Sequence, residues 1–441
     1  MARLILPAFG FLRRRLWRIV SLGVVLVAAA LGGVNLWAWH HFRAAEKALR
    51  EEHTEEAQSH ISHCLHIWGR SSETHLLAAR IDRAAGRYVE AERHLTECVR
   101  LQHGASEETQ IEQFLIRAQA GDLHEVEGGL WKCIKAGHPA SPRILETLAQ
   151  VYVREMRLMA AMDVLSRWIV LEPQAARAWQ WRGCVREQLE QPEWGIIPDF
   201  EKAVELEPER WGARMHLVRL ILKRNDLESA RPHLEVLLRH HADNLDVQLF
   251  QAQAFHLEGR IDEAVRLLDR LLQIQPHNFD ALYLGSQLAC EREPPRYQEA
   301  ERLLRLALAE RPADHSALHA LYRCLEDQGK AREAAQMNDH IHAVEADLNR
   351  LMQLRKKAIE LTPNDPQTLA EMGEILLRFG NAEEGLAWLN RALRLNPNHA
   401  PSHEILIRYY ESKDKAEEAD RHRQKLAQLT RRSPSAPETG K

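Results

Sequence analysis

The sequence predicts an all-α fold, in which antiparallel helix pairs form a solenoid behind one membrane-spanning helix. Strong helix formers, chiefly Leu, Ala, Glu, Arg and Gln, dominate a chain of 441 residues that has only 21 glycines, a composition that favours helices. Long alternations of Val, Ile and Thr are absent, so strands are not expected. The other two observations are an uncharged run of 21 residues near the N-terminus and helix-ending prolines that recur at intervals of about 34.

The uncharged run, residues 19–39, reads IVSLGVVLVAAALGGVNLWAW. A helix of 21 residues rises about 31 Å, which is enough to cross the hydrocarbon core of a bilayer. Trp17, Trp37 and Trp39 bracket the run at positions that suit the membrane interface. Residues 1–18 carry five arginines and no acid, so the positive-inside rule predicts a cytoplasmic N-terminus and an extracytoplasmic remainder.

Two alternatives to a permanent anchor remain open. Residues 28–30 are three alanines that could serve as the cleavage site of a signal peptide, although the apolar run continues to Trp39. A buried core helix is the second alternative, but no other segment of the chain is as apolar. Ala28 and Gly32 have the small-residue spacing that lets membrane helices approach, which is a hint of a homodimer.

The charge distribution excludes one class of partner. The net charge is −4, and because the first 18 residues are basic, the rest of the chain is more negative still. Nonspecific binding of nucleic acid needs a basic surface, so none is expected. The six cysteines form no CxxC pair, and we interpret them as reduced, packed residues rather than a disulfide framework.

A repeat of about 34 residues organises the chain. The prolines that end helices are separated by 35, 68, 36, 51 and 34 residues, and they are Pro173, Pro208, Pro276, Pro312, Pro363 and Pro397. Small residues open the second helices, except in the copy that ends at Pro208, which has Ile196 there. Glycines five residues before this position, as at Gly259 and Gly329, suit helix C-termini in the left-handed conformation. The interval of 51 equals one repeat and a half, which predicts an unusually long amphipathic helix.

These positions carry a family resemblance. Its clearest late copy contains Leu369, Met372, Gly373, Leu376, Gly380, Leu389, Ala392 and Pro397. An earlier copy contains Leu145, Ala149, Tyr152, Ala161, Leu165 and Pro173. The pattern resembles the tetratricopeptide repeat over residues 42–429, with degenerate copies at 42–68 and 106–138. The resemblance implies a right-handed superhelix of about eleven helix pairs, and it specifies fold rather than function.

The resulting organisation has six parts. Residues 1–18 form a basic cytoplasmic segment and residues 19–39 a transmembrane signal-anchor helix. Residues 42–330 form the main repeat array, residues 331–361 the long amphipathic helix, and residues 364–429 a C-terminal pair of repeats. Residues 430–441 are polar and rich in proline, which is typical of disorder.

No catalytic signature is present. The sequence lacks a P-loop, G-x-G-x-x-G, G-x-S-x-G and H-E-x-x-H, so we expect neither an enzyme nor a cofactor. His60 and Cys64 stand one helical turn apart and could share a metal ion, but no other cluster completes four ligands, so no metal site is predicted.

The family instead offers a groove for partner proteins. Its concave face, carried onto this sequence, comprises Arg143, Gln150, Arg154, Arg177, Gln180, Arg219 and Lys223, with Trp181 nearby. Arginine beside aromatic residues is the composition of interface hot spots, and a positive track would favour acidic segments. The alternative is that these arginines form an ordinary solvated face. Glu146 and Gln150 replace the Lys and Asn of the family's carboxylate clamp, so binding of a chaperone C-terminus is not supported.

The function that follows is a membrane-anchored scaffold for protein partners, similar to anchored bacterial proteins of this family that act in envelope assembly or secretion. That resemblance implies a single-pass protein of the bacterial inner membrane. One such family carries a C-terminal CxxC metal module that this chain lacks. Two alternatives stay open, namely a metal- or redox-dependent accessory factor or enzyme, and a self-assembling structural protein.

Overall fold

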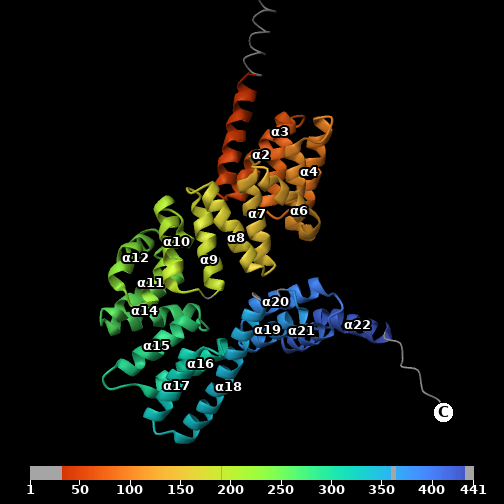
Figure 1. Ribbon diagram of the computed structural model, residues 1–441. Coiled ribbons are helices and arrows are strands. Elements are labelled where there is room, and N and C mark those ends of the chain that lie inside the picture. Colours follow the sequence, from red (N-terminus) through yellow and green to blue (C-terminus); the bar gives the residue numbers. More distant parts are fainter. Residues whose placement is uncertain (1–31, 190, 359–363, 433–441) are drawn as a thin grey trace, which may run out of the picture. The chain divides into compact units, whose positions relative to one another are not determined.

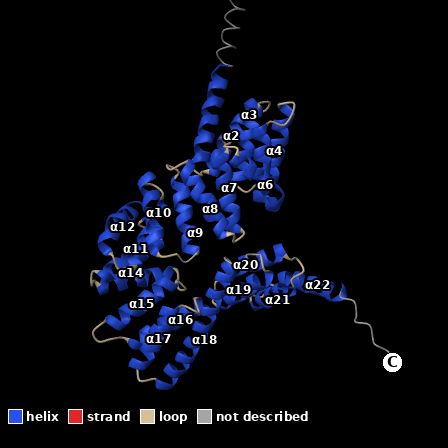
Figure 2. Ribbon diagram, viewed as in Figure 1, coloured by secondary structure: helices blue, strands red, loops and turns tan. Residues whose placement is uncertain are grey.

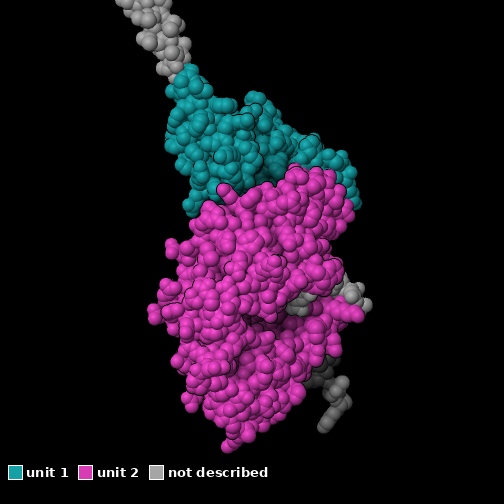
Figure 3. Space-filling model, turned by 90° about the vertical axis from the view of Figure 1, so that its left-hand side faces the viewer, with its two compact units in different colours: residues 1–151 teal, residues 152–441 magenta. Residues whose placement is uncertain are grey.

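The computed structural model describes residues 32–189, 191–358 and 364–432, and these are helices joined by short loops without a strand (Figure 2). The chain divides into two compact units, one that ends at Val151 and one that begins at Tyr152 (Figure 3). The prediction of an all-helical fold is therefore confirmed for the part of the chain that the structure describes.

The predicted transmembrane span lies largely outside the described residues. Residues 32–50 are helical, and Leu36, Trp37 and Trp39 are exposed there. Among the described helices, none combines the length and apolar character needed to cross a membrane. The anchor at residues 19–39 stays a prediction.

Unit 1 is a stack of helices (Figure 1). These helices pack through small and branched side chains. They are α2 Thr54–Trp68, α3 Ser72–Ala84, α4 Tyr88–Leu101, α5 Glu107–Arg117, the π-helical turn η1 Ala118–Asp122, α6 Leu123–Lys135 and α7 Ser141–Arg154, whose last residues belong to unit 2. Cys64 and Cys98 are fully buried in this stack, which agrees with the packing interpretation, whereas Cys133 is partly exposed.

Unit 2 contains the remaining helix pairs. They are α8 Leu158–Leu171, α9 Ala176–Gln188, α10 Glu193–Leu206, α11 Trp211–Lys223, α12 Leu227–His241, α13 Leu245–Leu257, α14 Ile261–Ile274, α15 Phe279–Glu291, α16 Tyr297–Glu310, α17 His315–Asp327, α18 Ala331–Lys356, α19 Pro366–Arg378, α20 Ala382–Leu395, α21 Ala400–Ser412 and α22 Ala416–Arg432. The sequence predicts a long helix over 331–361, and α18 occupies 331–356 with 26 residues; Pro363 lies outside the described residues.

At Gly329 the first helix of a repeat, α17, ends where the repeat pattern predicts. Gly329 has φ 74°, a left-handed conformation that costs glycine nothing. Its N–H donates to the carbonyl of Glu326 at 2.8 Å, and the N–H of Lys330 donates to Leu325 at 2.9 Å. This pair of hydrogen bonds is a Schellman cap, and it gives partners to two carbonyl oxygens that the helix leaves unpaired.

A recurrent side-chain bond fixes the turn between repeats. In five repeats the residue at the fourth position of the first helix makes a hydrogen bond through a side-chain nitrogen. The acceptor is the backbone carbonyl oxygen six residues earlier, at 2.8 to 3.1 Å. The residues at this position are His75, Trp179, Arg214, Gln248 and His403. Different side chains fill one role because each can present an N–H at this position, and the bond gives a partner to a loop carbonyl.

Candidate functional site

The eight predicted groove residues are divided between the two units. Arg143 and Gln150 lie in unit 1, and the other six lie in unit 2.

In unit 1, Arg143 belongs to a buried ion cluster rather than to an open groove. Its guanidinium lies 3.7 Å from a carboxylate oxygen of Glu112 on α5. Glu112 is fully buried and also accepts a hydrogen bond of 2.5 Å from Nε of Arg83, while Nε of Arg80 lies 3.5 Å away. Burial raises the pKa of Glu112, but the attraction of Arg83 and Arg80 outweighs it and holds the pKa below its usual range.

Gln150 extends the same network. Its side-chain oxygen accepts a hydrogen bond of 2.5 Å from Gln119, which in turn accepts one of 3.1 Å from Arg83. Arg143 and Gln150 therefore hold α3, α5, η1 and α7 together, and burial lowers the pKa of Arg143.

In unit 2, the predicted cations sit beside acids from the preceding repeat. Arg219 on α11 donates to Glu187 of α9 at 2.5 Å, and Lys223 lies 3.3 Å from Glu193 of α10. Burial raises the pKa of Glu187, but hydrogen bonds from His216 and the charge of Arg219 bring it below its usual range. The cations of α11 are thus largely neutralised, and the positive track that the sequence predicts is interrupted here.

The remaining predicted residues lie on α7 and α9. Arg154 is exposed, and Arg177 and Trp181 are partly exposed. Gln180 accepts a hydrogen bond of 3.0 Å from Arg210.

Arg219 and Lys223 do share a cavity of ≈ 590 Å³ with Glu187 and Glu193. It also includes Trp194, whose side chain is 78% exposed and which sequence reasoning missed. The cavity combines charges of both signs with one exposed aromatic ring.

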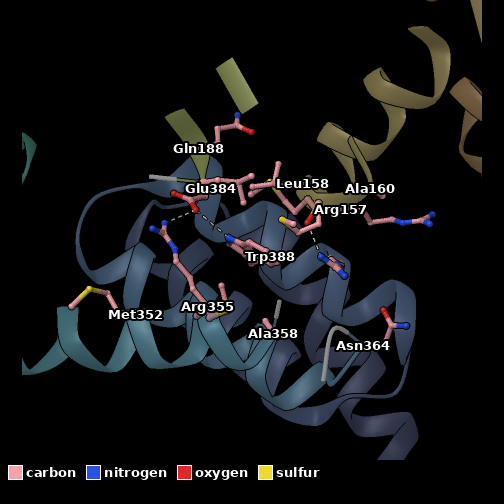
Figure 4. A pocket seen from close by; sticks show the side chains of 15 residues that line it. Arg157, Leu158, Ala160, Gln188, Met352, Arg355, Ala358, Asn364, Glu384 and Trp388 are labelled. Carbon is pink, nitrogen blue, oxygen red and sulfur yellow. Dashed lines mark hydrogen bonds and ion pairs between the residues drawn. The ribbon is translucent and has the colours of Figure 1, made fainter. Parts of the chain in front are cut away.

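A second cavity, of ≈ 470 Å³, has a more distinct chemistry and is called the α8–α20 pocket below (Figure 4). It lies within unit 2, where the start of α8 and the end of α9 face α18, α19 and α20. Its lining is Met156, Arg157, Leu158, Met159, Ala160, Gln188, Leu189, Met352, Arg355, Ala358, Asn364, Met372, Glu384, Trp388 and Arg391. Four of the eight methionines of the chain are in this set, and methionine adapts its shape to different ligands.

Hydrogen bonds preorganise one wall of the pocket. Glu384 accepts a bond of 2.9 Å from Arg355 and one of 3.2 Å from the indole nitrogen of Trp388 (Figure 4). Trp388 is nearly buried, so its ring orientation is set by α20 and by this carboxylate. A rigid aromatic ring beside flexible methionines is typical of protein-binding pockets.

Arg391 of α20 connects this wall to the residues just before α8. Its Nη1 donates to the carbonyl of Met156 at 2.6 Å, and its guanidinium lies 5.6 Å from the centre of the Trp388 ring. Burial, together with repulsion from Arg157 and Arg394, lowers the pKa of Arg391 to about 10. Three arginines against one glutamate leave the lining with an excess of positive charge.

Met156 itself has an unusual backbone. It has φ 55°, and it ends its helix where Gly259 and Gly329 end theirs. Left-handed backbone is uncommon for a long side chain. This conformation turns the Met156 carbonyl toward Arg391. The sequence offered no signal for the pocket, because its two halves are about two hundred residues apart.

His60 and Cys64, the pair that the sequence suggests could share a metal ion, do not converge in the structure. His60 Nδ1 contacts Nδ1 of His41 at 2.8 Å, while Cys64 Sγ points to the carbonyl of Ala38 at 3.3 Å.

Comparison with known proteins supports the repeat assignment. Residues 217–279 and residues 366–399 each match a tetratricopeptide repeat family model. Cellulose synthase operon protein C of Pseudomonas fluorescens is 26% identical over 189 residues, which cover 43% of this chain and 14% of that protein. A TPR repeat-containing protein of Pseudomonas aeruginosa is 27% identical over 192 residues, 42% of this chain and 29% of that protein. The chain therefore spans less than a third of the length of these relatives.

Solved structures show only distant similarity. Human IFIT1, in a dimer with m7Gppp-AAAA, has 16% identity and a TM-score of 0.39 over 82% of this chain and 90% of that one. The pilF protein of Pseudomonas aeruginosa has 14% identity and a TM-score of 0.35 over 58% and 99%.

Proposed function

We propose that this protein is a non-catalytic scaffold that binds segments of partner proteins in the α8–α20 pocket and is held at a membrane by residues 19–39. The observation that carries the proposal is the pocket lining, in which Trp388 and four methionines stand beside three arginines. Its volume of ≈ 470 Å³ lies in the range of ligand pockets, and its composition is that of an interface hot spot. The tetratricopeptide matches support a role in protein binding.

The chemistry of the pocket indicates what a partner segment should carry. An apolar side chain would pack against the exposed sulfur and methylene groups of Met159 and Met352, beside the nearly buried ring of Trp388. A carboxylate nearby would relieve the mutual repulsion of Arg157 and Arg391, and arginine can bind carboxylates bidentately. Acidic segments with an apolar anchor are therefore the proposed ligands. The same preference was expected of the groove residues Arg154 and Arg177.

Photo-cross-linking tests this proposal. A photoreactive amino acid is placed at Met159 or at Met352, which line the pocket and are 53% and 56% exposed. Val170 is the matched control, because it lies on α8 with Met159, is 79% exposed and is outside the pocket. Positions 159 and 352 should yield the same adducts in membranes, and these should be missing at position 170. Sequencing should locate the adduct beside Asp or Glu. Identical adducts at all three positions, or none at 159 and 352, would overturn the pocket assignment.

The proposed location is the extracytoplasmic side of a bacterial inner membrane, with a role in envelope assembly or secretion. It rests on the basic segment 1–18 and the uncharged run that follows it. A reporter enzyme fused after Lys441 should be active only outside the cytoplasm. Cytoplasmic activity would contradict the orientation, and release of the fusion into the soluble fraction would indicate cleavage instead of anchoring.

A further inference from the structure

Three side chains on α17 and α18 point at one another from the surface of unit 2. The Nε2 atoms of His315 and His319 are 3.1 Å apart. A carboxylate oxygen of Glu345 lies 3.3 Å from the first nitrogen and 3.8 Å from the second. Among the described residues, these three side chains are the group of potential metal ligands whose donor atoms all converge.

The helices fix this convergence. His315 and His319 are four residues apart on α17, so they share one face of the helix. Leu318 on α17 packs with Ile341 and Val344 on α18 in a buried cluster. The apolar contact sets the separation of the two helices, and the ligand atoms therefore come from rigid elements, as a preformed site requires.

The separations match a metal coordination shell. Bonds of 2.0–2.1 Å to nitrogen and 2.0–2.2 Å to oxygen in a tetrahedral site place neighbouring ligand atoms about 3.3 Å apart. The three distances here, 3.1, 3.3 and 3.8 Å, bracket that value.

A neighbouring histidine holds the carboxylate in place. Nδ1 of His342 lies 3.3 Å from the second oxygen of Glu345, the one that faces away from His315. Carboxylates that bind metals are commonly oriented by such outer partners.

We propose that His315, His319 and Glu345 form a binding site for a divalent transition metal ion, Zn²⁺ being the ion that fits best. Two imidazoles and one carboxylate are a donor set that zinc accepts, and three protein ligands leave a fourth position open to water. The ion would bridge α17 and α18 and stabilise that pair in proportion to its binding.

Titration with Co²⁺ tests the site in the purified full-length chain with its thiols reduced. Wild-type protein should bind one equivalent, give the visible absorption of tetrahedral cobalt without a thiolate charge-transfer band, and release it to one equivalent of Zn²⁺. His319→Ala should weaken this binding by at least about tenfold, which is already the cost of losing an outer partner. Glu345→Gln should weaken it as well.

His340→Ala is the matched control, because His340 is an exposed histidine on α18 outside the cluster and should leave binding unchanged. Circular dichroism checks that the variants, all changed at the surface, keep their helices. Equal affinity of wild type and His319→Ala, a thiolate band in the wild-type spectrum, or failure of wild type to bind cobalt would each overturn the proposal.

Discussion

Replacement of Gly373 by alanine tests the close crossing of α19 and α20, on which the Trp388 side of the pocket depends. A Cβ atom at this position would lie 2.7 Å from Cγ of Leu389 and 2.8 Å from the carbonyl oxygen of Gly385. Cγ is the branch point of a fully buried side chain, and the carbonyl is backbone. Neither atom can yield unless α20 moves as a whole.

The expected magnitude combines two opposed effects. Overpacking costs about 1–3 kcal/mol, and contact with backbone places this case near the upper end. Alanine regains about 1 kcal/mol because it is a better helix former than glycine. The free energy of unfolding of the α19–α20 pair should fall by about 2 kcal/mol. Gly128 on α6 has no atom within 4 Å of an added Cβ, so Gly128→Ala should keep only the favourable effect.

Amide hydrogen exchange, resolved helix by helix, is the suitable assay because a repeat array need not unfold in two states. Exchange in α19 and α20 should become faster in Gly373→Ala, whereas exchange in α6 should become slower in Gly128→Ala. The displacement of α20 should also reduce cross-linking from position 159. Slower exchange in both variants would refute the close crossing, and with it the account of how Trp388 is positioned.

Two further predictions concern the buried ion cluster and the modularity of the chain. Glu112→Gln should destabilise unit 1 by about 3–5 kcal/mol at neutral pH, because it leaves Arg83 and Arg80 without their buried counter-charge. Since the pKa of Glu112 is lowered in the folded state, its contribution to stability is present above the unfolded pKa of about 4.3 and is lost as pH falls through the folded pKa. The melting temperatures of wild type and variant should therefore converge in acid. A constant difference between them down to the lowest pH would contradict this. Deletion of residues 364–441 should remove helical signal in proportion to the residues lost, because each pair packs mainly on its neighbours; a much larger loss in circular dichroism would indicate one cooperative domain.

Much of the local structure could be read from the sequence. The prolines and glycines that mark helix ends do lie at helix ends wherever the structure describes them, as at Pro276 and Gly329. These features depend on the backbone preferences of single residues, which act over one helical turn. The burial of Cys64 and Cys98 followed from the same periodicity.

The electrostatic character of the predicted groove could not be read in this way. Arg219 was assigned to a positive track, but its partner Glu187 stands 32 residues earlier. Residues about one repeat apart lie side by side on neighbouring helices, so an acid that is distant in sequence neutralises the cation. Arg143 and Glu112 show the same effect inside unit 1.

The helices, their period and their ends follow directly from the order of residues, because they depend on interactions within a few positions. Which polar groups meet depends instead on how the helices pack in three dimensions. This packing brings Met156 against Arg391, and His319 against Glu345, through the way successive helix pairs stack and turn. Stacking depends on the shapes of whole buried faces, and no single residue or spacing in the sequence encodes that geometry.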